Sequence, residues 1–66
     1  MRIPKNTTYI KAYALINMNC ANKGDLIHFL KKSDGWHLEN DRTGDSYSAT
    51  LNHARNDKIF QIVGMI

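Results

Sequence analysis

The sequence predicts a small all-β domain of five short antiparallel strands, with one short helix near the end of the chain. The chain has 66 residues, of which 42% are hydrophobic and 23% charged, as in a single folded domain. Turn-forming residues recur about every 8–12 residues, a spacing typical of β-sandwiches and barrels. The segments between them alternate apolar and polar residues, as strands with one exposed face do. Residues 1–66 therefore form one domain, in which residues 1–6 are expected to be a flexible N-terminal arm.

The first strand is expected within residues 7–18. Its alternation puts five apolar residues on one face, namely Ile10, Ala12, Ala14, Ile16 and Met18. The other face carries a mixed set of Tyr9, Lys11, Tyr13 and Leu15. The β-propensity of Thr7, Thr8 and Tyr9 favours a strand for the first half. Residues 12–21 are apolar and tolerate a helix, so strand, loop and short helix all remain open for them.

The second and third strands are expected to form a hairpin. Residues 26–31 are apolar on both faces, as in a strand that crosses a small closed core, and residues 36–40 follow as the partner strand. Asp34-Gly35 has the composition of a two-residue hairpin loop. Such a loop would place Ser33 opposite Trp36 and Lys31 opposite Leu38.

The remaining elements are a strand at residues 47–51, a single helical turn near residues 52–56 and a last strand at residues 59–63. Gly24, Gly35 and Gly44 lie where turns need a positive φ angle. The expected core combines the inward-facing residues of all five strands: Ile10, Ala12, Ile27, Phe29, Leu38, Ala49, Phe60 and Ile62.

Four short motifs carry a resemblance to a known group of proteins. Lys23-Gly24 opens a strand, Asp34-Gly35-Trp36 forms an acidic hairpin, a second acidic turn at residues 40–45 leads to Tyr47, and the chain closes with Phe60-Gln61-Ile62-Val63. Over residues 7–63 the sequence resembles small SH3-like barrel accessory proteins of tailed bacteriophages. The resemblance implies a five-stranded SH3-like barrel encoded by a phage. Such accessory proteins share no single activity, but a phage origin implies that the partner is a host protein, which the chain would inhibit or redirect in the host cytoplasm.

Residues able to support catalysis or bind a metal ion do not form a recognisable pattern. Cys20, His28, His37 and His53 are separated by 8, 9 and 16 residues, whereas zinc ligands normally come in close pairs. A single cysteine cannot form an internal disulfide, which fits a reducing cytoplasm. The acidic residues cluster in turns, where they usually bond to nearby backbone. We therefore expect no enzyme activity, no metal ion and no cofactor.

The distribution of charged and apolar residues indicates whether the partner could be a polyanion or a membrane. The formal net charge is +3, and residues 1–33 contain six basic residues and one acid. Such an asymmetry can mark a face that binds polyanions. No apolar run approaches the roughly 20 residues that span a bilayer, and the charged N-terminus is not followed by an apolar stretch of signal-peptide length.

The working surface is expected around the central hairpin, where an aromatic residue lies among cations. Its predicted binding residues are Lys31, Lys32, Trp36, Arg42 and Tyr47. Trp, Tyr and Arg dominate the energetics of protein interfaces, so we predict a protein-interaction module in the cytoplasm. The alternative is a small β-barrel that binds nucleic acid, in which the same aromatic residues stack on bases.

Overall fold

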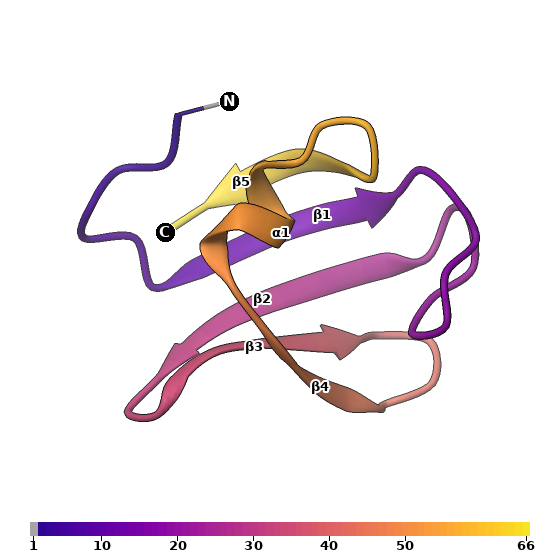
Figure 1. Ribbon diagram of the computed structural model, residues 1–66, viewed down its shortest axis with the longest axis horizontal. Helices are drawn as coiled ribbons and strands as arrows, with labels where there is room; N and C mark the ends of the chain where they lie inside the picture. Colours follow the sequence, from indigo (N-terminus) through magenta and orange to yellow (C-terminus); the bar gives the residue numbers. More distant parts are fainter. Residues whose placement is uncertain (1) are drawn as a thin grey trace.

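Five antiparallel strands form one sheet in the order β4-β3-β2-β1-β5 (Figure 1). The computed structural model describes residues 2–66, so Met1 of the expected arm lies outside the described residues. The strands are β1 (Tyr9–Ala14), β2 (Leu26–Lys32), β3 (Gly35–Asn40), β4 (Ser46–Ala49) and β5 (Phe60–Met65), and the short helix α1 (Leu51–Arg55) connects β4 to β5. The predicted all-β fold with five antiparallel strands and one short helix is confirmed.

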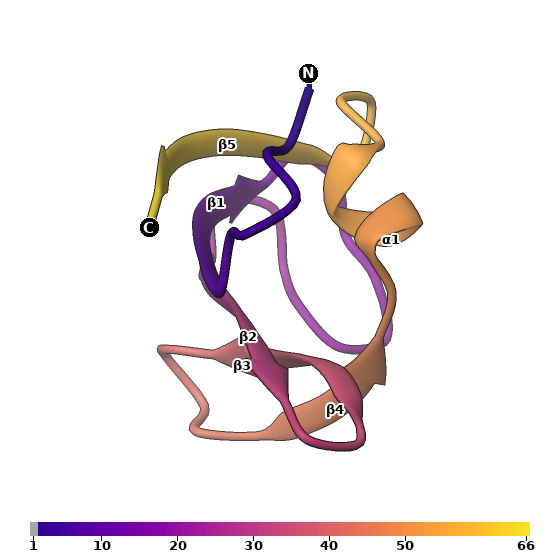
Figure 2. The same cartoon turned by 90° about the vertical axis from the view of Figure 1, so that its left-hand side faces the viewer.

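The sheet is strongly curved, and its inner face holds the core. Figure 2 shows β4 and β5 at opposite sides of the curved sheet, with α1 spanning the space between them. These two strands are the ends of the sheet order. Closure into the SH3-like barrel that the resemblance implies therefore stays a prediction.

The core contains residues from every strand except β4. Phe29 and Phe60 pack edge to face, with ring centroids 5.0 Å apart. Most of the predicted core is buried, and Ala49 and Ile62 are only partly buried against it. The sequence analysis missed four buried residues, which are Ile3, Ala14, Ala21 and Ala54. Ile3 lies in the segment expected to be a flexible arm, and Ala21 and Ala54 lie in a loop and in the helical turn, where strand alternation marks no inward position.

The N-terminal segment packs against this core at one point. Ile3 is 7% exposed and belongs to the core cluster. The backbone N–H of Thr7 donates to the carbonyl of Pro4, which closes a turn, and the N–H of Lys31 in β2 donates to the carbonyl of Thr8. The arm expected at residues 1–6 is thus anchored at Ile3.

The predicted register of the central hairpin is wrong by two residues. Lys32 pairs with Gly35 and Lys31 with Trp36, so the loop consists of Ser33 and Asp34. Within residues 2–66 only glycines have positive φ angles, and Gly35 has φ 123°. The primed turn expected at Asp34-Gly35 needs positive φ at both loop residues, which Asp34 does not adopt.

The strand at residues 26–31 was also misread, because only one of its faces lies in the core. Ile27 and Phe29 are buried on the inner face, whereas Leu26 and Leu30 are half-buried on the outer face. On that face they pair across the ladder with Tyr13 and Tyr9 of β1. The outer face of the sheet is exposed to solvent, and each of these leucines lies beside a tyrosine that can cover part of its surface.

Residues 15–25 form an irregular loop, so the short helix considered for residues 12–21 is wrong. β1 ends at Ala14, whose carbonyl accepts from the N–H of Gly24, and Met18 donates its N–H to the carbonyl of Ala21 in a turn. The predicted single-turn helix is confirmed one residue earlier than expected, at Leu51–Arg55. Thr50 caps it, because its hydroxyl accepts from the N–H of His53.

Candidate functional site

The five surface residues predicted from the sequence lie in separate places. Lys31 and Trp36 are cross-strand partners on the inner face of the hairpin. Lys32 is exposed and projects to the outer face, as strand alternation requires. Arg42 lies in the turn beyond the other end of β3, whereas Trp36 lies near the start of that strand. Tyr47, on β4, pairs with the middle of β3, so the structure does not bring the five residues into one patch.

Arg42 forms an ion pair with Asp25, a residue that sequence reasoning missed. Asp25 is 8% exposed, and the guanidinium reaches both of its oxygens, with Nε to Oδ1 at 2.8 Å and Nη2 to Oδ2 at 2.9 Å. Oδ2 also accepts from the backbone N–H of Asn22 at 2.8 Å. The Arg42 guanidinium, and then these further donors, hold the pKa of Asp25 well below its usual range. Arg42 thereby clamps the 15–25 loop to the β3–β4 turn.

Asn40 completes this clamp from the end of β3. Its side chain is fully buried, and its amide donates to the carbonyl of Cys20 at 3.1 Å and to Asp25 at 3.0 Å. Its Oδ1 accepts from the N–H of Arg42 at 3.0 Å and of Thr43 at 3.4 Å. Because the amide nitrogen and oxygen of Asn40 both have hydrogen-bond partners, its burial costs little free energy, and the bonds fix the geometry of the loop.

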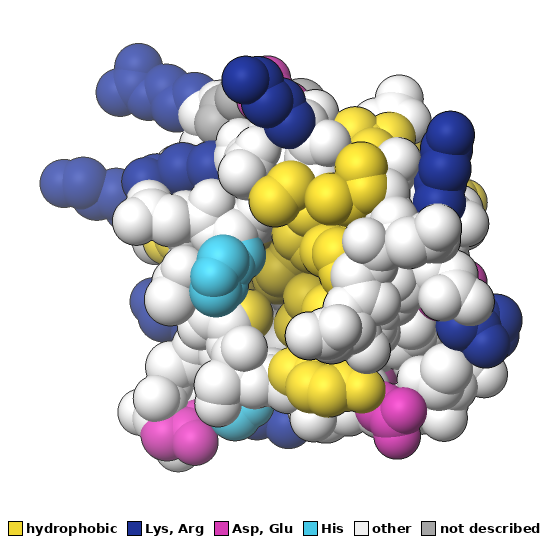
Figure 3. All heavy atoms as spheres, turned by 45° about the vertical axis from the view of Figure 1, so that its right-hand side comes forward, with side chains coloured by type: hydrophobic (Ala, Val, Ile, Leu, Met, Phe, Trp, Pro, Cys, Tyr) yellow, Lys and Arg dark blue, Asp and Glu magenta, His cyan; other side chains and the backbone are white. Residues whose placement is uncertain are grey.

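Hydrophobic residues of the 15–25 loop, β4 and the start of α1 keep part of their surface exposed at the margin of the core. Figure 3 shows hydrophobic side chains gathered across the middle of one side of the molecule, with a shallow hollow at their centre. We define the apolar face as Tyr47 and its neighbour Cys20, together with Met18 and Leu51, which pack against the same core. Tyr47 is the most prominent, since it lies on the inner face yet is 39% exposed.

The hydroxyl of Tyr47 stays neutral across the physiological pH range. Burial, followed by the negative charge of Asp45 and the neighbouring Cys20, raises the pKa of Tyr47 above its usual value. A neutral phenol combines a large apolar ring with one hydrogen-bond donor, which suits a protein contact. The apolar face therefore offers an aromatic anchor without a charge to desolvate.

The outer face carries a hydrogen-bonded chain of three side chains that the sequence did not indicate. The hydroxyl of Tyr9 lies 2.7 Å from Nδ1 of His28, and Nε2 of His28 lies 2.9 Å from Oδ1 of Asp41. In the tautomer that carries its hydrogen on Nε2, His28 donates to Asp41 and its Nδ1 accepts from the hydroxyl of Tyr9. The rings of Tyr9 and His28 also stack at 5.7 Å. This chain orders the outer face of β1 and β2.

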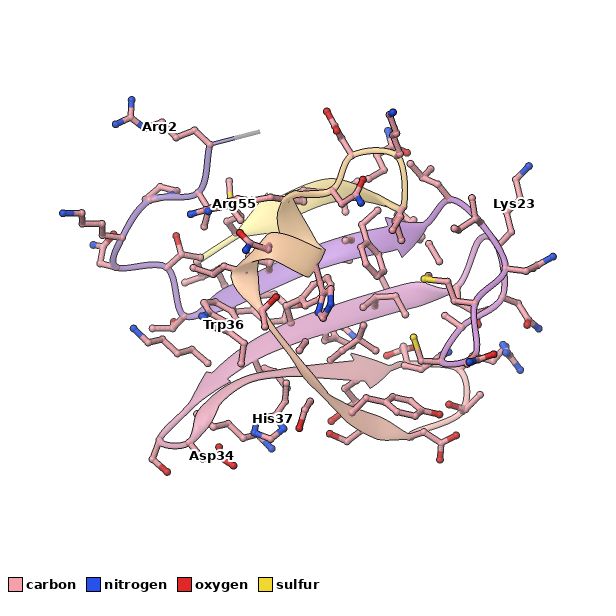
Figure 4. All side chains as sticks on the ribbon, in the orientation of Figure 1. Arg2, Lys23, Asp34, Trp36, His37 and Arg55 are labelled. Carbon is pink, nitrogen blue, oxygen red and sulfur yellow. The ribbon has the colours of Figure 1, made fainter. Side chains whose placement is uncertain are left out.

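One end of the molecule is rich in cations. In Figure 4, Arg2, Arg55 and Trp36 lie on the same half of the molecule, with Arg2 at its upper corner and Trp36 lower down, and Lys23 lies at the opposite end. We define the basic end as Trp36 with the exposed residues Arg2, Lys5, Lys31 and Arg55. The acid of the adjoining hairpin loop, Asp34, is directed to the outer face by a 2.8 Å contact with Nε2 of His37.

Metal-ion clusters and enclosed pockets were sought in the part of the chain that the structure describes. Residues 2–66 contain no group of three His, Cys, Asp or Glu side chains placed to bind a metal ion, and they enclose no pocket. No helix within them is long and apolar enough to cross a membrane. The surfaces that remain are the apolar face and the basic end.

The chain was compared with protein-family models, curated proteins and solved structures. No protein-family model, no curated protein and no solved structure matches the chain.

Proposed function

We propose that this protein is a non-enzymatic protein-interaction module that binds a partner protein through the apolar face. The observation that carries the proposal is Tyr47, a large aromatic residue that is 39% exposed at the margin of the hydrophobic core. Tyrosine is enriched among the residues that dominate interface energies, and it loses little conformational entropy on binding. Exposed apolar area beside it would be removed from water by a partner.

The surroundings of Tyr47 support a protein as the partner. The apolar face is shallow, and a shallow surface buries little of a small molecule but can bury much of a protein loop. The clamp of Asp25, Asn40 and Arg42 holds the 15–25 loop in place beside it. A preorganised loop lowers the entropic cost of binding.

The resemblance to phage accessory proteins adds the expectation that the partner is a host protein. Within this proposal, the module acts in the host cytoplasm and inhibits or redirects that protein by covering one of its surfaces. It needs no cofactor for this role.

The test compares two tyrosines of equal exposure on opposite faces. Tyr47 is 39% exposed on the inner face and Tyr13 is 38% exposed on the outer face. Wild type, Tyr47→Ala and Tyr13→Ala are used to capture partners from nuclease-treated host lysate, and the captured protein is then purified for titration. We expect Tyr47→Ala to weaken binding at least about 30-fold, as a hot-spot residue does, and Tyr13→Ala to leave it unchanged.

Two results would overturn the proposal. Loss of every partner on nuclease treatment would show that nucleic acid carries the interactions. Equal weakening by Tyr47→Ala and Tyr13→Ala, in variants that keep the wild-type melting temperature, would show that the apolar face is not the contact surface.

A further inference from the structure

The basic end brings together cations from three segments of the chain. Arg2 and Lys5 lie on the N-terminal arm, Lys31 ends β2, and Arg55 is in the last turn of α1. The backbone that follows the arm is held beside the end of β2, because the carbonyl of Thr8 accepts from the N–H of Lys31. All four side chains are exposed, and none forms an ion pair with an acidic side chain in residues 2–66.

Trp36 is a partly exposed aromatic residue that pairs directly with one of these cations, Lys31. It packs against the core from the edge, pairs with Lys31 across the ladder and with Ala49 on the other side, and is only partly buried. Figure 4 shows Trp36 and Arg55 on one side of the hairpin, with Asp34 and His37 beyond the strand. The contact of Asp34 with His37 thus keeps the acid of the hairpin loop away from the face that Trp36 shares with Lys31.

We propose that the basic end binds single-stranded nucleic acid, with Trp36 stacked on a base and the surrounding cations on the phosphates. A flat ring beside dispersed cations is the arrangement by which small β proteins hold single strands. A duplex would not use the ring, because its bases are already stacked on one another. This surface differs from the apolar face, so the proposal is independent of the proposed protein partner.

An acidic peptide is the competing ligand for the same cations. Peptide recognition generally relies on pockets that hold anchoring side chains, and residues 2–66 enclose none. Base stacking needs no pocket, only an accessible part of an aromatic ring, and Trp36 is partly exposed. The geometry therefore favours nucleic acid, and the experiment below includes the peptide as a competitor.

The test uses Trp36 as its own reporter, because it is the single tryptophan in the chain. A thymidine oligonucleotide of about 12 nucleotides, within the range that one small β-barrel covers, is titrated against tryptophan emission. We expect emission to be quenched on binding. Four phosphate contacts predict that raising salt from about 50 to 200 mM weakens binding about 50-fold.

Two charge-matched double variants locate the site. Lys31→Gln with Arg55→Gln removes two of the four cations, so the same salt increase should weaken the remaining binding only about 7-fold. Lys23→Gln with Lys58→Gln removes the same charge elsewhere, since Lys23 is at the opposite end in Figure 4 and Lys58 lies two residues before Phe60, which pairs with Ala14 at the end of β1 farther from Lys31. This control should bind and respond to salt as the wild type does.

Several results would overturn the proposal. They are binding without a change in tryptophan emission, binding that salt does not weaken, and equal losses in the two double variants. Displacement of the oligonucleotide by an oligoglutamate of equal charge at equal concentration would also overturn it, because the site would then recognise negative charge alone.

Discussion

The edge-to-face pair of Phe29 and Phe60 should make a measurable contribution to stability beyond the burial of each ring. The ring planes are 87° apart, and the side chains are 0% and 3% exposed. Pairs with this geometry contribute about 0.5–1.5 kcal/mol in addition to the apolar area they bury. β2 and β5 are not neighbours in the sheet, so the two rings join strands that no backbone ladder connects directly.

The substitution must be mild enough to leave a folded protein. Truncation of either ring to alanine costs about 3–5 kcal/mol, which equals the whole stability expected of a domain this small. Phe29→Ala and Phe60→Ala should therefore be unfolded at room temperature. Leucine keeps most of the volume, and Phe29→Leu or Phe60→Leu should each cost about 1–1.5 kcal/mol.

The assay is urea unfolding followed by the fluorescence of Trp36, for wild type, the two leucine variants and the double variant. The double variant should lose less than the sum of the two single losses, by about 1 kcal/mol, because either substitution alone already removes the ring–ring contact. Losses that add to within about 0.3 kcal/mol would refute the reasoning. The rings would then act only as apolar volume.

Three further predictions concern the ion pair, the tryptophan and the thiol. Folding lowers the pKa of Asp25, so the stabilisation that its ion pair gives the folded state is complete above the unfolded pKa of about 4 and is lost as pH falls toward the folded pKa. The melting temperature of wild type should therefore fall below about pH 4, whereas that of Asp25→Asn should be lower at neutral pH and change less. Trp36→Ala removes a partly buried ring, about half the cost of a fully buried one, and should lower the melting temperature by about 10 °C; no change would place Trp36 outside the core. Cys20→Ala keeps an apolar side chain on the apolar face and leaves the backbone contact with Asn40 in place, so partner affinity should stay within about twofold of wild type by titration; a larger loss would show a role for the thiol.

The fold was largely predictable because its signals are local. Gly24, Gly35 and Gly44 have φ angles of 92°, 123° and 76°, as the turn residues around them implied. Alternation between these turns identified the inward positions of β1, β3 and β4. The helical turn was predicted within one residue, because a short polar segment separates two strand-like runs.

The central ion pair was hidden by one error in register. In the observed hairpin Ile27 pairs with Asn40, and continuing the ladder by two residues brings Asp25 opposite Arg42. The predicted register placed Gly44 opposite Asp25, which left Arg42 without a partner and made it a candidate for binding. A hairpin loop of Ser33 and Asp34 would have revealed the pair from the sequence.

The contact between Tyr9, His28 and Asp41 could not be derived in this way. It depends on the register of β1 against β2, and these strands are joined by the irregular loop of residues 15–25. A loop of that length specifies no pairing, whereas a tight turn does. Its partners were therefore visible in the sequence only as separate polar residues.

The position of β5 has a consequence for the order of folding. Successive hairpins join β1 to β4 through contacts between neighbouring segments, but β5 returns to pair Met65 with Ile10 near the start of the chain. Pairings between distant segments raise the contact order and slow folding, and the ribosome releases β5 last. Until β5 has been synthesised, β1 is an unpaired edge strand, and Ala14 lacks its partner Phe60. The growing chain is thus most prone to aggregate just before its last strand is complete.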